Sequence, residues 1–410
     1  MERKDIALVI TGHIDHGKST LIGRLLFDTN SLPRDKMEEA LKASRELGKE
    51  FEFAFLVDQL QEEREKELTI DTTQAFFKTN KRHYIIIDAP GHAEFIKNMI
   101  TGATQAEAAV VVVSAEKGVE EQTKRHAYIL GLLGISTVIG VINKMDLVEY
   151  SRDRFESVRQ ELQKFFDRIG IKNPRVLPLS AKTGAGVLRR DKLMNWYKGP
   201  TLIEALDAIE PRAAVTRGPL RFPIQDIYPI EGKEVAVGRV VSGTIRRNQD
   251  VVILPSRKEA RIDSIHVFGE CKTQAREGEN IGIQFTGQIK TQRGDVVCQK
   301  DDIPPLSKRF KGNIFWMSSE PLRVRDTFLL RCATQEAECS VVTIEKRLNS
   351  STLEATEDNP QAVGLNEVGA VVLEAKTPLV IEKFTVREDL GRFGLEVGGS
   401  LVGSGTITGT

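Results

Sequence analysis

Five short apolar runs in the first half of the chain constrain its fold more than any other feature. They are apolar on successive residues, as is typical of strands buried on both faces of a parallel sheet. They span residues 6–10, 84–87, 108–113, 137–142 and 176–179. Segments with helical periodicity separate them, at residues 19–26, 94–101, 123–133 and 152–166. This alternation predicts a doubly wound α/β domain with a mostly parallel sheet over residues 1–210.

The pattern changes near Pro211. From there on, short strand-like runs such as 234–241 and 250–254 are separated by Gly, Asn, Asp and Pro. This pattern indicates an all-β region, and its 200 residues suffice for two small domains of roughly 100 residues each. Pro304 and Pro305 interrupt strand pairing and therefore suggest the boundary. We predict two small β-barrel domains, over residues 211–302 and 303–410.

Composition excludes several classes of protein. The chain has 58 basic and 58 acidic residues and is 40% hydrophobic, which excludes a disordered chain and one that binds nucleic acid through a large basic field. Its four cysteines form no C-x-x-C pair, so we expect reduced thiols and no cysteine zinc site. The apolar run near the N-terminus is too short for a signal peptide or a membrane span. We expect a cytoplasmic protein without a membrane partner.

A glycine-rich segment directly follows the first predicted strand and fits the pattern G-x-x-x-x-G-K-[ST]. Backbone N–H groups of such a loop surround phosphate oxygens, and the following helix adds its positive dipole end. We expect Lys18 to contact the β- and γ-phosphates and the Ser19 hydroxyl to bind Mg²⁺. The residues predicted to bind the phosphates are Gly12, His13, Ile14, Asp15, His16, Gly17, Lys18, Ser19 and Thr20.

The motif Asn143-Lys144-Met145-Asp146 predicts that the base is guanine. Asp146 can accept hydrogen bonds from both N1–H and the exocyclic amine, a pair of donors that adenine lacks. We expect Asn143 to lie against the base and the phosphate loop, and the Lys144 stem to cover the base plane. A second segment after the last predicted strand matches the backbone that reads guanine O6, and it consists of Ser180, Ala181 and Lys182.

Three further residues are predicted to respond to the γ-phosphate. Asp88 follows a predicted strand and is placed to hold Mg²⁺ through a water molecule. The Gly91 amide can contact the γ-phosphate, and losing that contact on hydrolysis would release the segment. Thr69 is the candidate threonine that closes on Mg²⁺ through its hydroxyl. The predicted ligands are therefore GTP, GDP and Mg²⁺.

These motifs resemble the translation-factor GTPases. The segment GHIDHGKSTL is close to the GHVDHGKSTL of elongation factors Tu and 1-alpha, and DAPGHAEFIKNMITGA, GVEEQTKRHAYILGLLGI and INKMDLV continue the likeness. The resemblance implies that His92 positions the attacking water, with Ile14 and Leu68 as an apolar gate. It implies a GTPase whose catalytic residues are His92, Lys18 and Asp15. We assign no catalytic role to the remaining histidines, His13, His16, His83, His126 and His266.

One residue departs from the family's pattern. Glu67 stands where the family usually has a glycine in the segment before Thr69. Glycine permits positive φ, and glutamate in that conformation costs about 1 kcal/mol or more. We therefore expect this segment either to follow another path or to be less ordered when GTP is bound.

The branch of the family is indicated by longer segments. Residues 36–65 begin with a helix-like stretch, 36–48, and resemble both elongation factor 1-alpha and the CysN-type large subunit of sulfate adenylyltransferase. Residues 315–317, 320–322, 365–369, 378–380 and 391–393 resemble the third domain of the CysN type. Our main hypothesis is therefore a GTPase subunit that couples GTP hydrolysis to formation of adenosine 5′-phosphosulfate. Its partner would be a small adenylyltransferase subunit.

Two alternatives stay open. The first is a translation factor of the 1-alpha or Tu type that delivers aminoacyl-tRNA to the ribosome, favoured by His16 and by Gly91-His92-Ala93. Residues 211–410 contain 27 basic and 26 acidic residues, a balance that argues against a track for tRNA phosphates. The second is a CysN-like module that binds another protein client in a GTP-dependent manner.

Overall fold

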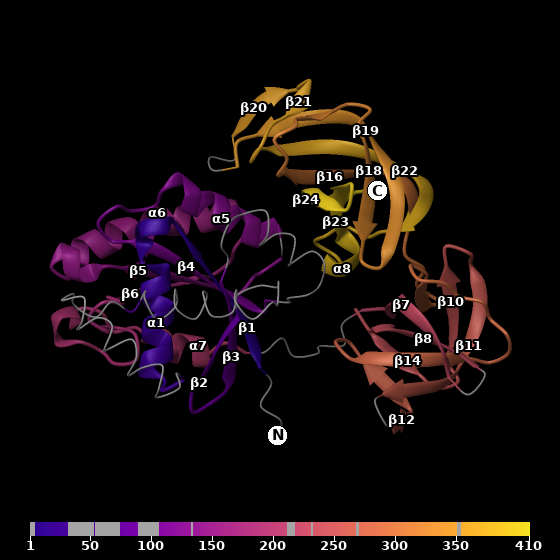
Figure 1. Ribbon diagram of the computed structural model, residues 1–410, viewed down its shortest axis with the longest axis horizontal. Coiled ribbons are helices and arrows are strands. Elements are labelled where there is room, and N and C mark those ends of the chain that lie inside the picture. Colours follow the sequence, from indigo (N-terminus) through magenta and orange to yellow (C-terminus); the bar gives the residue numbers. More distant parts are fainter. Residues whose placement is uncertain are drawn as a thin grey trace. The chain divides into compact units, whose positions relative to one another are not determined.

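The computed structural model describes residues 5–31, 53, 74–88, 106–132, 134–210, 218–230, 233–267, 270–350 and 354–410. The chain forms two compact units, Met1–Pro211 and Arg212–Thr410, and each is considered by itself (Figure 1). None of the helices in the described residues is both long and apolar enough to cross a membrane.

The first unit is built on a six-stranded sheet with the order β2-β3-β1-β4-β5-β6. All neighbouring strands are parallel except β2, which runs antiparallel to β3 at the edge. The sheet confirms the predicted doubly wound α/β fold, and each of the five apolar runs forms a strand. The strands are β1 (Ile6–Gly12), β2 (Gln74–Lys78), β3 (His83–Asp88), β4 (Ala108–Ser114), β5 (Val138–Asn143) and β6 (Arg175–Pro178).

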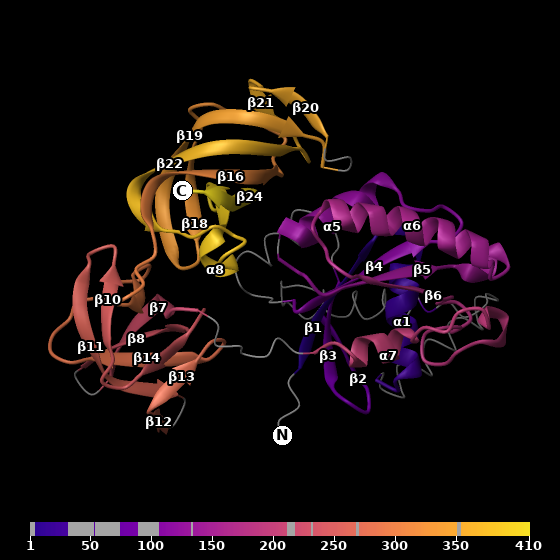
Figure 2. The same ribbon diagram turned by 180° about the vertical axis from the view of Figure 1, so that it is seen from behind.

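Helices cover both faces of this sheet, which explains why its central strands are apolar on every residue. In Figures 1 and 2, α1 and α7 lie on one face of the sheet, and α5 and α6 lie on the other. The helices are α1 (Lys18–Asp28), α5 (Glu121–Leu132), α6 (Arg152–Arg168) and α7 (Leu202–Asp207), with 3₁₀ turns η1 (Ile14–His16), η2 (Met145–Val148) and η3 (Lys192–Met194). The helix predicted over 94–101 lies outside the described residues, as does the helix-like stretch 36–48.

One strand and one α-helix in the described part of this unit were not predicted, and each gives a weak local signal. β2 is a five-residue strand between polar ends, and Phe76 at its centre is 56% exposed. Its apolar run of three residues is too short to be told from a loop. α7 is only six residues long, and a capping box formed by Thr201 and Glu204 fixes its first turn.

The second unit contains two closed antiparallel barrels, as predicted. In the first, the strand order is β10-β15-β7-β8-β14-β11-β12, and pairing of β10 with β11 closes the ring. Its strands are β7 (Arg221–Ile230), β8 (Lys233–Arg239), β9 (Thr244–Arg246), β10 (Asp250–Leu254), β11 (Lys258–Val267), β12 (Glu270–Lys272), β13 (Gln274–Arg276), β14 (Asn280–Phe285) and β15 (Val296–Gln299).

In the second barrel, the order is β18-β23-β24-β16-β22-β19-β20, and pairing of β18 with β19 closes the ring. Its elements are β16 (Leu306–Trp316), β17 (Leu322–Arg323), β18 (Thr327–Cys332), β19 (Gln335–Leu348), β20 (Ala355–Asp358), β21 (Ala362–Val363), β22 (Val368–Val380), α8 (Glu388–Gly391), β23 (Arg392–Val397) and β24 (Ser400–Gly409). Within the described residues, closure leaves no long unpaired edge in either ring.

A buried arginine joins the two barrels. The Arg221 side chain on β7 is 2% exposed; its Nε donates to Glu382 Oε2 at 3.1 Å and its Nη2 to Asp302 Oδ1 at 2.6 Å. Its Nη1 donates to the carbonyl oxygens of Leu220 and Asp302, both at 3.0 Å. An apolar cluster from both barrels is buried beside it, formed by Val252, Leu254, Val296, Cys298, Val380 and Leu390.

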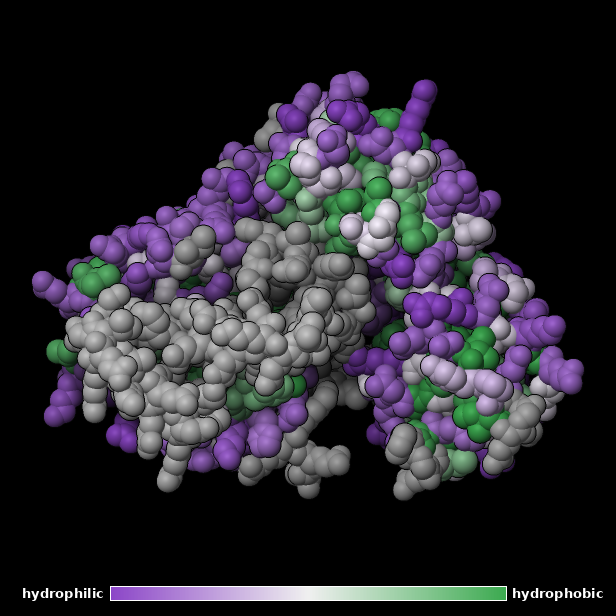
Figure 3. All heavy atoms as spheres, in the orientation of Figure 1, coloured by the Kyte–Doolittle hydropathy of each residue, from purple (hydrophilic) through white to green (hydrophobic). Residues whose placement is uncertain are grey.

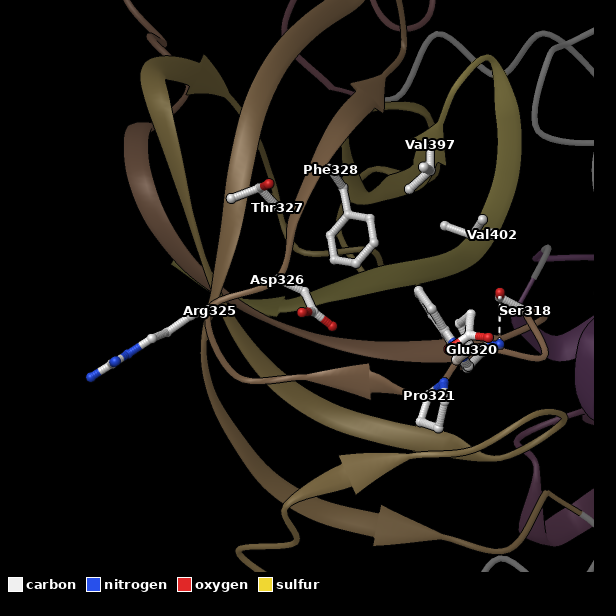
Figure 4. Close-up of a pocket in the computed structure, with 10 residues that line it drawn as sticks. Ser318, Glu320, Pro321, Arg325, Asp326, Thr327, Phe328, Val397 and Val402 are labelled. Carbon is white, nitrogen blue, oxygen red and sulfur yellow. Dashed lines mark hydrogen bonds between the residues drawn. The ribbon is translucent and has the colours of Figure 1, made fainter.

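The second barrel also has an open hollow near one end (Figure 4). Trp316, Phe328, Val397 and Val402 line it with apolar surface, and Asp326 lies among them. Figure 3 shows hydrophobic side chains on the surface of this barrel. Val397, which lines the hollow, is 53% exposed. The hollow contains none of the residues predicted to bind the nucleotide.

Candidate nucleotide-binding site

The predicted nucleotide-binding segments lie at the carboxyl ends of parallel strands in the first unit. The phosphate loop follows β1, the Asn143–Asp146 motif follows β5, and Ser180 follows β6. Because parallel strands end at one edge of the sheet, these loops are neighbours. This edge is where α/β sheets bind their ligands.

The phosphate loop takes a conformation that requires both of its glycines. Gly17 has φ 85° and ψ 34°, in the left-handed region, and α1 begins at the next residue, Lys18. A Cβ atom at Gly17 would lie 2.5 Å from Asn143 Nδ2, and one at Gly12 would lie 2.4 Å from Val112 O. The loop therefore lies flat against β4 and β5, and Lys18, Ser19 and Thr20 form the first turn of α1.

Asn143 connects the phosphate loop to the loop after β6. Its side chain is buried, and its Nδ2 donates to His16 O at 2.9 Å while its Oδ1 accepts from Ala181 N at 2.9 Å. One amide group thus fixes the positions of two loops that are far apart in the sequence. This contact agrees with the expected place of Asn143 against the phosphate loop.

Asp146 is held in place through one of its two carboxylate oxygens. Oδ1 accepts from Ser180 Oγ at 2.6 Å, and Ser180 Oγ accepts in turn from Thr183 N at 3.2 Å. Among the described residues, no hydrogen bond to Oδ2 is found, and the side chain is only partly buried. Lys144 has φ 61° and lies between Asn143 and η2, the 3₁₀ turn that contains Asp146. The arrangement presents an oriented carboxylate to a ligand.

Asp15 forms an ion pair that sequence reasoning missed. Its carboxylate accepts from Lys117 Nζ at 3.1 Å, and both side chains are exposed. The hydrogen bond from Lys117 lowers the pKa of Asp15 below its usual value. Lys117 lies after β4, so it is a neighbour of the phosphate loop across the β1–β4 pair.

A second group of unpredicted contacts involves the two histidines of the phosphate loop. His16 is fully buried, with Nδ1 3.2 Å from Val112 O and Nε2 2.6 Å from Glu120 Oε2. His13 Nδ1 is 3.5 Å from the same carboxylate oxygen. Burial lowers the pKa of His16 below its ordinary value, against the opposite effect of Val112 and Glu120. The one sequence signal for Glu120 is its place in the loop that joins β4, ending at Ser114, to α5, beginning at Glu121.

Not every predicted site residue falls within the described residues. Thr69, Gly91 and His92 lie outside the described residues, as do Glu67 and Leu68. Asp88 ends β3, and its backbone is paired in register with Ile10 of β1. Ile14 forms the start of η1.

Models of known families match the chain in three segments. The model described as elongation factor Tu GTP binding domain matches residues 3–212, and elongation factor Tu domain 2 matches residues 233–298. The model described as GTP-eEF1A C-terminal domain-like matches residues 309–408. The chain belongs to the family of elongation factor GTPases. GTP and GDP are the nucleotides of this family, which acts as a GTPase, and Mg²⁺ is its usual cofactor.

Curated members of the elongation factor family resemble the chain over nearly its whole length. Elongation factor 1-alpha of Methanoculleus marisnigri is 39% identical, over 98% of this chain and 97% of that protein. Elongation factor 1-alpha of Archaeoglobus fulgidus is 38% identical, over 99% of this chain and 98% of that protein. Among solved structures, sup35 complexed with GDP is 25% identical with a TM-score of 0.46, over 99% of this chain and 94% of that one.

These relatives show that the sulfate adenylyltransferase hypothesis was wrong, and with it the small adenylyltransferase partner. The segments that suggested the CysN type are largely packing residues of the second barrel. Phe315 and Trp316, for example, are buried on β16, and Val380 and Phe393 are buried on β22 and β23. Residues of this kind fill the interior of a barrel, and proteins that bind unrelated clients can share them.

Proposed function

We propose that this protein is a translation factor of the elongation factor 1-alpha kind, which carries aminoacyl-tRNA to the ribosome in its GTP-bound state. Support comes from relatives of that name, 38–39% identical over nearly the whole chain. Support also comes from the nucleotide site, whose base-recognition loops are held together by hydrogen bonds of Asn143 and Ser180. That site is what a GTP-controlled carrier requires, because tRNA release must follow hydrolysis.

The observation that carries the proposal is a pair of hydrogen-bonded connections, Ser180 to Asp146 and Asn143 to both His16 and Ala181. Ser180 orients the Asp146 carboxylate at 2.6 Å, and Asn143 joins the base loops to the phosphate loop. Guanine offers two donors to such a carboxylate, so the site selects guanine over adenine. Lys144 covers the base plane, and the backbone of Ala181 and Lys182 contacts the guanine O6.

At the phosphate end, the N–H groups of residues 12–20 and the Lys18 ammonium stabilise the charge that develops during hydrolysis. Ser19, Thr69 and Asp88 would hold Mg²⁺, which would neutralise charge on the phosphate oxygens. His92 orients the attacking water and Gly91 contacts the γ-phosphate. Asp15, through Lys117, holds the loop in its binding conformation. Loss of the γ-phosphate contacts then releases the segments that carry Thr69 and Gly91.

The neutral charge of residues 211–410 does not oppose this function. A total of 27 basic and 26 acidic residues describes a whole unit, whereas tRNA phosphates contact only a patch of it. The balance excludes a uniformly basic surface and leaves local basic patches open.

Retention of tRNA on the immobilised full-length protein tests the proposal. The protein is loaded with a non-hydrolysable GTP analogue or with GDP, and is offered aminoacyl-tRNA and deacylated tRNA in parallel. We expect strong retention of aminoacyl-tRNA with the GTP analogue and weak retention in the other combinations. Equal retention in both nucleotide states, or none in either, would overturn the proposal. Retention of another protein in place of tRNA would instead support a GTP-dependent module with a different client.

A further inference from the structure

Three side chains with metal-ligating atoms converge beside the phosphate loop. They are His13 and His16 from the loop and Glu120, which directly precedes α5. Their nearest ligand atoms, the Nδ1 of His13, the Nε2 of His16 and a carboxylate oxygen of Glu120, all lie within 4.8 Å of one another. The nucleotide contacts proposed above use none of these side-chain atoms.

The tautomer of His16 is fixed by its backbone partner. Val112 O can only accept a hydrogen bond, so the proton of neutral His16 is on Nδ1, 3.2 Å away. The Nε2 atom then directs its lone pair at Glu120 Oε2, 2.6 Å away. A ring N–H donated to a backbone carbonyl is the usual support for a metal-binding histidine.

His13 contributes a second nitrogen atom, Nδ1, to the cluster. Its Nδ1 is buried and has no hydrogen-bond partner in the described part of the chain, and it lies 3.5 Å from Glu120 Oε2. In the neutral tautomer with its proton on Nε2, His13 also offers a lone pair at Nδ1, and two nitrogen lone pairs and one carboxylate oxygen then face each other. Such an arrangement is favourable only when a cation or a proton lies among them.

We propose that His13, His16 and Glu120 bind one divalent transition-metal ion of the zinc class. Imidazole nitrogen with carboxylate oxygen is a donor set that suits Zn²⁺, which takes three protein ligands and leaves a fourth position to water. Mg²⁺ prefers an octahedron of oxygen atoms, so this site does not compete with the magnesium ligands proposed above.

The distances allow this assignment with a small movement. Ligand atoms about 2.0–2.2 Å from Zn²⁺ lie roughly 3.3–3.6 Å apart in a tetrahedron. The His13–Glu120 distance of 3.5 Å fits, and the His16–Glu120 distance of 2.6 Å must lengthen. The Glu120 side chain can supply that movement because it is 34% exposed, and His13 at 27% exposure leaves a route from solvent.

Titration of the full-length protein with Co²⁺ tests the site, because four-coordinate Co²⁺ absorbs visible light and replaces Zn²⁺ in such sites. The protein is first saturated with GDP and Mg²⁺, so that the magnesium site is filled. We expect one Co²⁺ per chain with a tetrahedral absorption band, and complete displacement by one equivalent of Zn²⁺. A proton shared between His16 and Glu120 would instead give no such band, and this outcome would overturn the proposal.

Two substitutions and a control locate the ion. Glu120→Gln keeps the side-chain shape and His13→Ala changes a partly exposed residue, and each should weaken Co²⁺ affinity about tenfold or more. The control is His83→Ala, since His83 pairs with Asp5 at 3.6 Å in an exposed position. Circular dichroism and thermal unfolding report that each variant is folded. An unchanged Co²⁺ band in both site variants would show that the ion binds elsewhere and would overturn the proposal.

Discussion

Both units of this protein bury polar side chains where separate segments meet, but they use them differently. In the first unit, Asn143 and Ser180 join loops, and among the described residues one oxygen of Asp146 has no hydrogen bond, as the proposed base recognition requires. In the second unit, Arg221 uses Nε, Nη1 and Nη2 on protein acceptors, with Glu382 as its buried partner. A partly buried group with unused hydrogen-bonding capacity is suited to binding, whereas a buried group whose donors are all used is suited to rigidity. Substitutions in the two units should therefore change different quantities.

The largest effect is expected for Asp146→Asn. An amide presents its N–H₂ group to guanine donors, so GTP affinity should fall by about 10⁴-fold while xanthine nucleotides gain affinity. The stability of either unit should be almost unchanged, since Asn can still accept from Ser180. Calorimetric titration with GDP and with the xanthine analogue measures both effects, and Asp153→Asn, exposed on α6, is the control. Unchanged GDP affinity would remove Asp146 from base recognition.

The next effect concerns stability and comes from Glu382→Ala. This change leaves the buried Arg221 guanidinium with only the carboxylate of Asp302, which is 52% exposed. Removing one partner of a buried ion pair costs about 3 kcal/mol. Denaturant unfolding followed by circular dichroism measures the loss, and GDP affinity should stay at its original value. A variant that lost GDP affinity without losing stability would contradict the division between the units.

His92→Ala should alter neither base recognition nor stability. If His92 orients the attacking water, single-turnover GTP hydrolysis should fall by about 10²-fold or more, because water then lacks an oriented acceptor. GTP affinity should remain within a few-fold of the original. Rapid-quench measurement of phosphate release from preloaded protein gives the rate, with His126→Ala as the matched control. Equal rates in the His92 and control variants would exclude the assigned role.

Local patterns predict most residues of the candidate nucleotide site, but they miss its long-range contacts. The glycines of the phosphate loop and Asp146 carry their chemistry in a few adjacent residues, so spacing alone identified them. Glu120 meets His16 across 104 positions and Arg221 meets Glu382 across 161, and no short motif records either pair. The small adenylyltransferase partner was predicted wrongly for a related reason. Neither net charge nor the packing residues of a barrel show where a partner binds on the surface.

The smallest effect is expected where the same chemistry occurs without burial. Arg261 and Asp250 pair across β10 and β11 with two contacts, at 2.7 and 3.1 Å, but both side chains are more than half exposed. Water solvates either partner alone, so Asp250→Asn should change the free energy of unfolding far less than Glu382→Ala does.

The pH dependence of that small difference has a definite sign. The hydrogen bond from Arg261 holds the pKa of Asp250 below its usual value. The stabilisation from this ion pair is therefore present above the pKa that Asp250 has in the unfolded chain. It is lost as the pH falls through the pKa of Asp250 in the folded protein. Thermal unfolding of the wild type and of Asp250→Asn should differ slightly at neutral pH and converge in acid. If Asp250→Asn destabilised the protein as much as Glu382→Ala, burial could not be what separates the two arginine pairs.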